Sequence, residues 1–117
     1  PHPDISLVIP VYNEIENIEL LERAIIANLA GQNYEVIFVN DGSTDGSTLR
    51  IKECCARHSN FRAIHFKKHA GQTAAMDAGF KHACGKYIVS MDADMQNDPA
   101  DIPKLLEKLH LYDMVCG

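Results

Sequence analysis

The chain has 117 residues, a formal net charge of −5 and a hydrophobic content of 46%. This size and composition fit one globular domain with its own core and argue against a disordered chain. The acidic balance gives no basic footprint for nucleic acid, and no apolar run is long enough to cross a membrane. The first residues also lack the basic and apolar segments of a signal peptide, so we expect a cytoplasmic protein.

The cysteines show neither a Cys-x-x-Cys pair nor the spacing of a zinc site, so we expect free thiols in a reducing compartment. They are Cys54, Cys55, Cys84 and Cys116. We expect any membrane association, for example at the cytoplasmic face, to be made by regions outside this chain.

The first predicted elements are a strand and a helix. The stretch from Ile5 to Pro10 is short, apolar and partly β-branched, which predicts a buried strand that ends at the proline. Residues 15–29 place apolar side chains at three- and four-residue spacing, which predicts a helix with one apolar face. Asn13 and Glu16 have the spacing of a capping box at its start, and Gly31 fits its end.

The rest of the chain repeats this alternation of strand and helix. Apolar or alternating runs predict further strands at residues 34–39, 61–66, 86–91 and 113–116. Helical patterns cover residues 47–58 and 72–84, with Gly85 as a C-cap, and a last helix begins at Asp98.

Such an alternation predicts an α/β fold, a mostly parallel sheet between two layers of helices. We expect residues 1–117 to form one such unit. No helix follows the last predicted strand, so we expect the unit to be part of a longer protein.

Polar residues follow each predicted strand, at residues 10–14, 40–43, 67–69 and 92–96. Because ligands of open parallel sheets bind beyond the carboxyl ends of the strands, these segments are expected to form one site. An acid there can accept hydrogen bonds from a nucleobase or ribose, and Tyr12 can pack against a base. No Walker-type loop and no Gly-x-Gly-x-x-Gly follows the first strand, so phosphates would be handled by a metal and by local basic groups.

The stretch from Asp92 to Gln96 predicts the metal site. Carboxylate and amide oxygens suit Mg²⁺ or Mn²⁺, and a cation held by Asp94 and Gln96 could bridge diphosphate oxygens and stabilise a leaving diphosphate. Asp45 and Asp98 are expected to be helix caps. Other roles stay open: Tyr12 could be a packing residue, Glu14 a solvated acid of the first helical turn, and the basic loop at 67–69 either a solvated edge or a phosphate contact.

Four motifs in order resemble those of the inverting glycosyltransferases of family 2, which have the Rossmann-like GT-A fold. They are Ile9-Pro10-Val11-Tyr12-Asn13-Glu14, Val39-Asn40-Asp41-Gly42-Ser43-Thr44-Asp45-Gly46, Gly71-Gln72-Thr73-Ala74-Ala75-Met76 with Ala78-Gly79, and Met91-Asp92-Ala93-Asp94-Met95-Gln96 with Asp98-Pro99. The first and last are most similar to those of the polyprenyl-phosphate glycosyltransferases. The resemblance covers nearly the whole chain and implies its nucleotide-binding half.

The resemblance implies a role for each matching position. The nucleotide site would be lined by Pro10, Tyr12, Glu14, Val39 and Asp41. Asp92 and Ala93 would contact the nucleotide-sugar, while Asp94 and Gln96 would hold Mg²⁺ or Mn²⁺. Where the family often has Arg-Asn, this chain has Lys68-His69, so Lys68 is a candidate phosphate contact without the bidentate geometry of arginine.

The resemblance also implies what this chain lacks. The catalytic base is expected beyond Gly117, so we name no catalytic residue within the chain and expect it to be inactive alone. The donor would be a UDP- or GDP-linked sugar, and the acceptor a polyprenyl phosphate or a glycan of the cell wall or membrane.

Three alternative classes share parts of this pattern, and one of them is a non-catalytic binding module made from a degenerate transferase. A receiver-type phosphoacceptor domain also gathers acids around magnesium, but it needs an acidic pair after strand one and a single aspartate after strand three. A nucleotidyltransferase would carry a glycine-rich basic loop after strand one. Nucleotide binding that depends on a metal would separate the transferase from a receiver, which beryllofluoride with magnesium should stabilise.

Overall fold

The computed structural model describes residues 2–93. Four predictions fall on residues 94–117 and lie outside the described residues. They are the metal ligands Asp94 and Gln96, the helix from Asp98 and the strand at 113–116.

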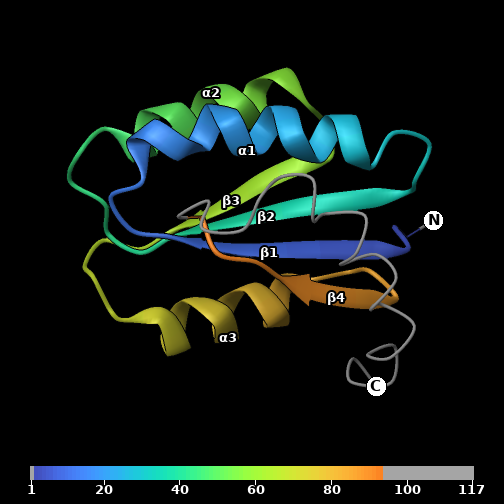
Figure 1. Ribbon diagram of the computed structural model, residues 1–117. Helices are drawn as coiled ribbons and strands as arrows, with labels where there is room; N and C mark the ends of the chain where they lie inside the picture. The colour runs from blue at the N-terminus through green and yellow to red at the C-terminus, as the bar shows by residue number, and fades with distance from the viewer. Residues whose placement is uncertain (1, 94–117) are drawn as a thin grey trace.

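The described chain forms a parallel four-stranded sheet in the order β3-β2-β1-β4. The strands are β1 (Ile5–Val11), β2 (Tyr34–Asn40), β3 (Phe61–His65) and β4 (Tyr87–Ser90). The helices are α1 (Ile15–Asn28), α2 (Ser47–Arg57) and α3 (Gln72–His82). Figure 1 shows α1 and α2 over one face of the sheet and α3 over the other. The predicted α/β fold, with helices on both faces of a parallel sheet, is confirmed.

The core has two sides because neighbouring strand residues point to opposite faces. Ile9, Val11 and Phe38 pack with the apolar faces of α1 and α2. Val8 and Val39 pack on the other side, against α3. There, Gly79 lacks the Cβ that would clash with Val8, so α3 lies close to the sheet.

Pro10 does not end the first strand as predicted, because β1 continues to Val11. In a parallel strand, alternate residues direct their backbone groups to opposite neighbours. Val11 pairs towards β2, where its carbonyl accepts from Asp41 N, so Pro10 faces the β4 side. The β4 ladder ends at the Val8–Ser90 pair, and the missing N–H of Pro10 therefore breaks no ladder bond there.

The predicted capping box of the first helix is wrong. Glu14 holds the cap position, and no side chain of the predicted pair caps the helix. Asn13 instead has φ 54° and accepts a hydrogen bond from Thr44 N at 2.7 Å. The helix start is held by Ser47 Oγ, which accepts from Glu14 N at 3.0 Å. A partner distant in the sequence has replaced the local one.

Gly85 is also not the C-cap of the third helix. This helix ends at His82, and its cap is Ala83 in an extended conformation. Gly85 N donates to Ser6 Oγ at 2.7 Å, and a Cβ on the glycine would lie 2.5 Å from that oxygen. Glycine is therefore needed at this position because the chain passes very close to β1.

Within residues 2–93, no helix is both long and apolar enough to span a bilayer. In the same range the cysteines are free thiols, of which Cys54 is buried and Cys84 exposed. Burial raises the pKa of Cys54 to about 12, so this thiol is unreactive at neutral pH.

Candidate functional site

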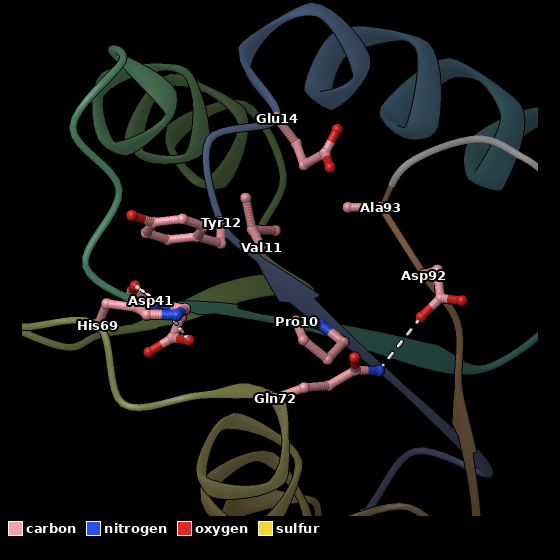
Figure 2. Close-up of a pocket in the computed structure, with 9 residues that line it drawn as sticks. All are labelled: Pro10, Val11, Tyr12, Glu14, Asp41, His69, Gln72, Asp92 and Ala93. Carbon is pink, nitrogen blue, oxygen red and sulfur yellow. Dashed lines mark hydrogen bonds and ion pairs between the residues drawn. The ribbon is translucent and has the colours of Figure 1, made fainter.

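A pocket of about 220 Å³ lies at the carboxyl edge of the sheet (Figure 2). It is lined by Pro10, Val11, Tyr12, Glu14, Asp41, His69, Gln72, Asp92 and Ala93. Complete small-molecule sites enclose roughly 300–1,000 Å³, so the described residues account for part of a site of that kind. Its place beyond the ends of parallel strands is the one expected for a ligand site in this fold.

Asp41 directly follows β2 and organises the loop after β3. Its Oδ1 accepts from Ala70 N at 2.7 Å, and its Oδ2 accepts from Gly71 N at 3.0 Å. His69 Nδ1 lies 2.9 Å from the same Oδ2. The Asp41 side chain is only 4% exposed, so these contacts supply the hydrogen bonds that a buried carboxylate needs. Asp41 thus fixes the backbone of residues 69–71 beside the pocket.

Gly42 allows the loop after β2 to contact the loop after β3. Its φ is +71°, and a Cβ on it would lie 2.5 Å from His69 N and 2.6 Å from the carbonyl carbon of Lys68. Both obstacles are backbone atoms, which cannot turn away as the end of a flexible side chain can. Glycine is therefore required for both the conformation and the contact.

Tyr12 and His69 form an aromatic pair at one side of the pocket. Their ring centroids are 4.0 Å apart and the ring planes are inclined by 35°. Tyr12 is 43% exposed, so part of its ring surface remains open to a ligand. Such a ring can stack on a nucleobase, which every base permits through its flat face.

The turn between β2 and α2 also supports the start of α1. Asp45 Oδ1 accepts from Ser47 N at 3.0 Å and Oδ2 accepts from Ile15 N at 3.2 Å, so one carboxylate serves two helix starts. Burial alone would raise the pKa of Asp45, but hydrogen bonds from the Ser47 hydroxyl, Ser47 N and Ile15 N lower it below its ordinary value. Asp45 is therefore not the cap residue that was predicted, because Gly46 occupies the cap position, but its carboxylate does accept from Ser47 N at the start of α2.

Asn40, the last residue of β2, also stabilises the turn between β2 and α2. Its Oδ1 accepts from Ser43 N at 3.2 Å, and its Nδ2 lies 3.0 Å from His65 Nδ1. Because an amide nitrogen only donates, His65 Nδ1 must accept, so the ring is neutral there. Burial, followed by the charge of Lys52, lowers the pKa of His65 and favours that neutral form.

Asp92 and Gln72 close the opposite side of the pocket. Asp92 is exposed and follows β4, and Gln72 is the first residue of α3. A dashed line in Figure 2 joins Gln72 Nε2 to Asp92 Oδ1, which are 3.5 Å apart. This contact is long for a hydrogen bond, so both groups keep most of their capacity for a ligand.

The charges of the lining residues are mostly negative, since Glu14, Asp41 and Asp92 are acids and no lysine or arginine is among them. An anionic diphosphate would need a cation to enter such a site. Among residues 2–93, no group of three potential ligands is arranged to hold a metal. The exposed carboxylate of Asp92 suits a hard cation such as Mg²⁺ or Mn²⁺ but supplies a single ligand residue.

The structure brings together most of the predicted site residues in its described part. Those that line the pocket are Pro10, Tyr12, Glu14, Asp41, Asp92 and Ala93. Val39 does not, because its side chain is fully buried against α3. Lys68 is exposed and is not among the lining residues.

Sequence reasoning assigned no pocket role to Val11 or Gln72 and left His69 as a solvated edge or phosphate contact. Gln72 lay in a recognised motif, Gly71-Gln72-Thr73, whose position at a helix start could have suggested it. Nothing local could have paired His69 with Asp41, which lies far away in the sequence.

Comparison with known proteins identifies the family. The model of "Glycosyl transferase family 2" matches residues 6–117. An undecaprenyl-phosphate 4-deoxy-4-formamido-L-arabinose transferase from Klebsiella pneumoniae (strain 342) is 41% identical over 98% of this chain and 36% of its own length. The chain thus spans about a third of the length of the curated relatives it matches.

Two solved structures share the fold at 26% sequence identity. The mannosyltransferase PcManGT from Pyrobaculum calidifontis, in complex with GDP-Man and Mn²⁺, matches with a TM-score of 0.69 over 80% of this chain and 28% of its own. TarS 1-349 from S. aureus, in complex with UDP-GlcNAc, matches with a TM-score of 0.69 over 78% of this chain and 26% of its own. With the motifs in place, the family model matched and the fold shared, the chain belongs to glycosyltransferase family 2 and has a GT-A fold.

Proposed function

We propose that this chain binds a nucleotide-diphosphate sugar and is the donor-binding part of an enzyme that transfers the sugar to an acceptor with inversion. The observation that carries the proposal is the pocket at the carboxyl edge of the sheet. It brings the open ring of Tyr12 and the buried acid Asp41 to one side and the exposed acid Asp92 to the other. The first side suits a nucleoside, and the second suits a diphosphate with a cation.

The names of the relatives indicate the chemical classes of the donor and the acceptor. The two structural neighbours hold GDP-Man with Mn²⁺ and UDP-GlcNAc, and the curated relative is an undecaprenyl-phosphate sugar transferase. We infer a UDP- or GDP-linked sugar as donor for this chain. We infer a polyprenyl phosphate as acceptor, with a membrane or cell-wall glycan as the other class.

The described residues would act by binding and orienting the donor. Tyr12 would stack on the base, while Asp41 would fix the loop beside it. Pro10 and Ala93 give the pocket small, rigid walls, and Asp92 would face the diphosphate and sugar. Glu14 lines the same pocket, and its backbone N is held by Ser47 Oγ; its carboxylate would accept hydrogen bonds from the ribose. The roles of Val39 and Lys68 remain predictions from the resemblance.

The metal assignment is part of the proposal. Asp94 and Gln96 would hold Mg²⁺ or Mn²⁺ next to Asp92, and a bound cation would offset the negative charge of the diphosphate. The carboxylate oxygens of Asp92 are suitable ligands for such an ion. The acidic lining of the described pocket also leaves a need for positive charge that its own residues do not meet.

Transfer requires the acceptor oxygen to bond to the anomeric carbon while the bond to the nucleoside diphosphate breaks. A phosphate acceptor is already ionised at neutral pH, so little deprotonation is needed. For a hydroxyl acceptor, we expect a base beyond Gly117. Residues 1–117 would therefore supply the donor half of the site. The family match removes the support for the receiver and nucleotidyltransferase alternatives.

The test is calorimetric titration of the purified protein with UDP, GDP and CDP, with and without Mn²⁺. We expect at least one nucleotide to bind, and to bind about tenfold more weakly without the metal. Asp92→Asn and Asp94→Ala should each reduce the metal-dependent part of the affinity.

Asp77→Asn is the matched control, because Asp77 is an exposed acid on α3 that pairs only with Lys81 in the described part of the chain. It should bind nucleotide like the wild type. Binding that is indifferent to metal and to both site substitutions would disprove the metal assignment. Absence of binding for all three nucleotides would disprove the proposed function.

A further inference from the structure

We propose that Gln72 is a positioning residue, which orients the carboxylate of Asp92 towards the cation and diphosphate of the donor. This inference rests on the proposed function, because it takes Asp92 to be the acid that faces the diphosphate. It gives a role to a residue that lines the pocket and to which the sequence assigned none.

The backbone around Asp92 is held at few points. Strand β4 has four residues and forms one edge of the described sheet. The last backbone hydrogen bond before Asp92 runs from Met91 N to Val8 O at 3.1 Å, and Asp92 itself is exposed. Within residues 2–93, the one hydrogen bond of its side chain comes from Gln72 Nε2. The orientation of this carboxylate in the described structure therefore depends on Gln72.

Gln72, in contrast, is fixed from both sides. Before it, Gly71 N donates to Asp41 Oδ2 at 3.0 Å, and Gly71 O accepts from Ala75 N at 3.1 Å. After it, the first turn of α3 is anchored by Ala75, which is fully buried between this helix and the sheet. A donor on a rigid element thus faces an acid on a less constrained segment, and in such a pair the donor orients the acid.

The other residues that line the pocket offer no equivalent group beside Asp92. Their side-chain N–H groups belong to His69 and Gln72, and the His69 ring contacts Asp41. Figure 2 shows His69 and Asp41 together on one side of the pocket, while the Gln72 side chain extends towards Asp92. Gln72 therefore brings an amide to the side of the pocket that we assign to the diphosphate.

The length of the contact suits orientation rather than neutralisation. At 3.5 Å, the hydrogen bond from Gln72 Nε2 to Asp92 Oδ1 is too long to satisfy the carboxylate. The attraction between the amide dipole and the charge still favours the orientation in which Oδ1 faces Gln72. In the described part of the chain Oδ2 has no hydrogen-bond partner, so it stays available to a cation. A carboxylate that is already oriented loses less freedom when it binds.

The experiment compares the affinity of the wild type and Gln72→Met for UDP or GDP, whichever binds more tightly, with and without Mn²⁺. Competition against a fluorescent derivative of that nucleotide also measures weak binding. Methionine has a similar length and no amide. Residues that orient a metal ligand typically contribute 10–100-fold to metal affinity, and the long contact points to the lower end. We expect about tenfold weaker binding in Mn²⁺ and a change of less than about twofold without it.

A double-mutant cycle with Asp92→Ala separates orientation from direct contact. If Gln72 acts through Asp92, Gln72→Met should change the affinity in Mn²⁺ by less than about twofold once Asp92 is alanine. An amide that binds the diphosphate itself would keep its tenfold effect in that background. Gln72→Asn retains the amide on a shorter side chain that cannot reach Asp92, so it should lose affinity as Gln72→Met does.

Gln32→Met is the matched control, because it makes the same chemical change at an exposed glutamine in the turn between α1 and β2. It should bind nucleotide like the wild type. Urea denaturation provides the second control, since Gln72 is exposed and its replacement should leave the unfolding midpoint unchanged. A lower midpoint together with weaker binding in the absence of Mn²⁺ would show a structural role and overturn the inference.

The outcomes separate this inference from the proposed function. If the wild type binds nucleotide with Mn²⁺ and Gln72→Met binds equally well, Gln72 does not position Asp92. The same factor of loss with and without Asp92 overturns the inference too, because the two residues then act independently. Full affinity in Gln72→Asn contradicts it as well. If the wild type binds no nucleotide, the proposed function fails first and this inference with it.

Discussion

A buried carboxylate lies at each end of β2, and the one at the carboxyl end, Asp41, lines the pocket described above. Glu35, near the start of the strand, accepts from Ser6 Oγ at 2.6 Å, from Cys84 N at 2.7 Å and from Arg62 Nε at 3.0 Å. Asp41, just past the end, accepts from Ala70 N and Gly71 N and contacts His69. Each carboxylate joins segments that are distant in the sequence.

The two clusters differ in their third partner. Arg62 also donates to the carbonyl of His82, so its guanidinium is engaged on the protein itself. His69 gives Asp41 one ring nitrogen and turns the other side of a half-exposed ring towards the pocket. We call the Glu35 cluster the sealed end, because Arg62, although 44% exposed, donates to the protein itself, and the Asp41 cluster the open end, because it lines the pocket. We infer that Glu35 serves stability and that the Asp41 cluster serves binding.

Among the substitutions proposed, Gly42→Ala should have the largest effect on the open end. The substitution forces an alanine into φ +71° and places its Cβ against the backbone of Lys68 and His69. We expect a loss of about 2–4 kcal/mol in the free energy of unfolding and loss of measurable nucleotide binding, because the loop beside the pocket must move.

Gly31→Ala is the matched control for this change. Gly31 has a similar φ of +84°, but a Cβ there would meet nothing within 4 Å. We expect a cost of about 1 kcal/mol and unchanged binding. Urea denaturation and nucleotide titration measure both quantities. Equal effects of the two substitutions would show that the loops do not depend on the close contact at Gly42.

Glu35→Gln should damage the sealed end and spare the open one. It removes the charge that Arg62 faces and leaves one oxygen to accept the hydrogen bonds from Ser6 and Cys84. We expect a loss of about 2–3 kcal/mol in the free energy of unfolding with nucleotide affinity unchanged within about twofold.

The control for Glu35→Gln is Glu19→Gln, since the Glu19 side chain is 49% exposed and its partner Arg23 is 72% exposed. An exposed pair of this kind contributes at most about 0.5 kcal/mol. Chemical denaturation and calorimetry provide the comparison. A marked loss of nucleotide affinity in Glu35→Gln would mean that the two ends of β2 are coupled.

Local sequence patterns predicted the fold because they are set by neighbouring residues. The period of the apolar residues located β1 to β4 and α1 to α3 within residues 2–93, and the alternation of strand and helix fixed their parallel arrangement. Parallel topology then brought Tyr12, Asp41 and Asp92 to one edge. That step needed only the order of the elements.

The predictions that failed depended on partners distant in the sequence. Asn13 matched a local capping box, but its partner Thr44 comes from the turn after β2. Gly85 matched a helix C-cap, but its function is a close approach to Ser6. His69 gave no local sign of its contact with Asp41. Patterns of residue type locate elements, whereas such pairings follow from how the elements pack.

Low pH should reduce the stability of the sealed end by protonating Glu35. Glu35→Gln removes this ionisable group. Burial alone would raise the pKa of Glu35, but the hydrogen bonds from Ser6, Cys84 and Arg62 together lower it below its ordinary value of 4.5. The folded protein therefore favours the charged form more than the unfolded chain does. This stabilisation is fully present above about pH 4.5 and is lost as the pH falls through the folded pKa.

The free energy of unfolding, measured by urea denaturation between pH 7 and pH 3, checks this pH dependence. The difference between wild type and Glu35→Gln should shrink as the pH falls below about 4.5. Gly31→Ala carries the same ionisable groups as the wild type, so its difference from the wild type should stay constant over that range. A Glu35→Gln difference that is equally constant would show that the charge of Glu35 adds nothing to stability, and that packing alone seals the amino end of the sheet.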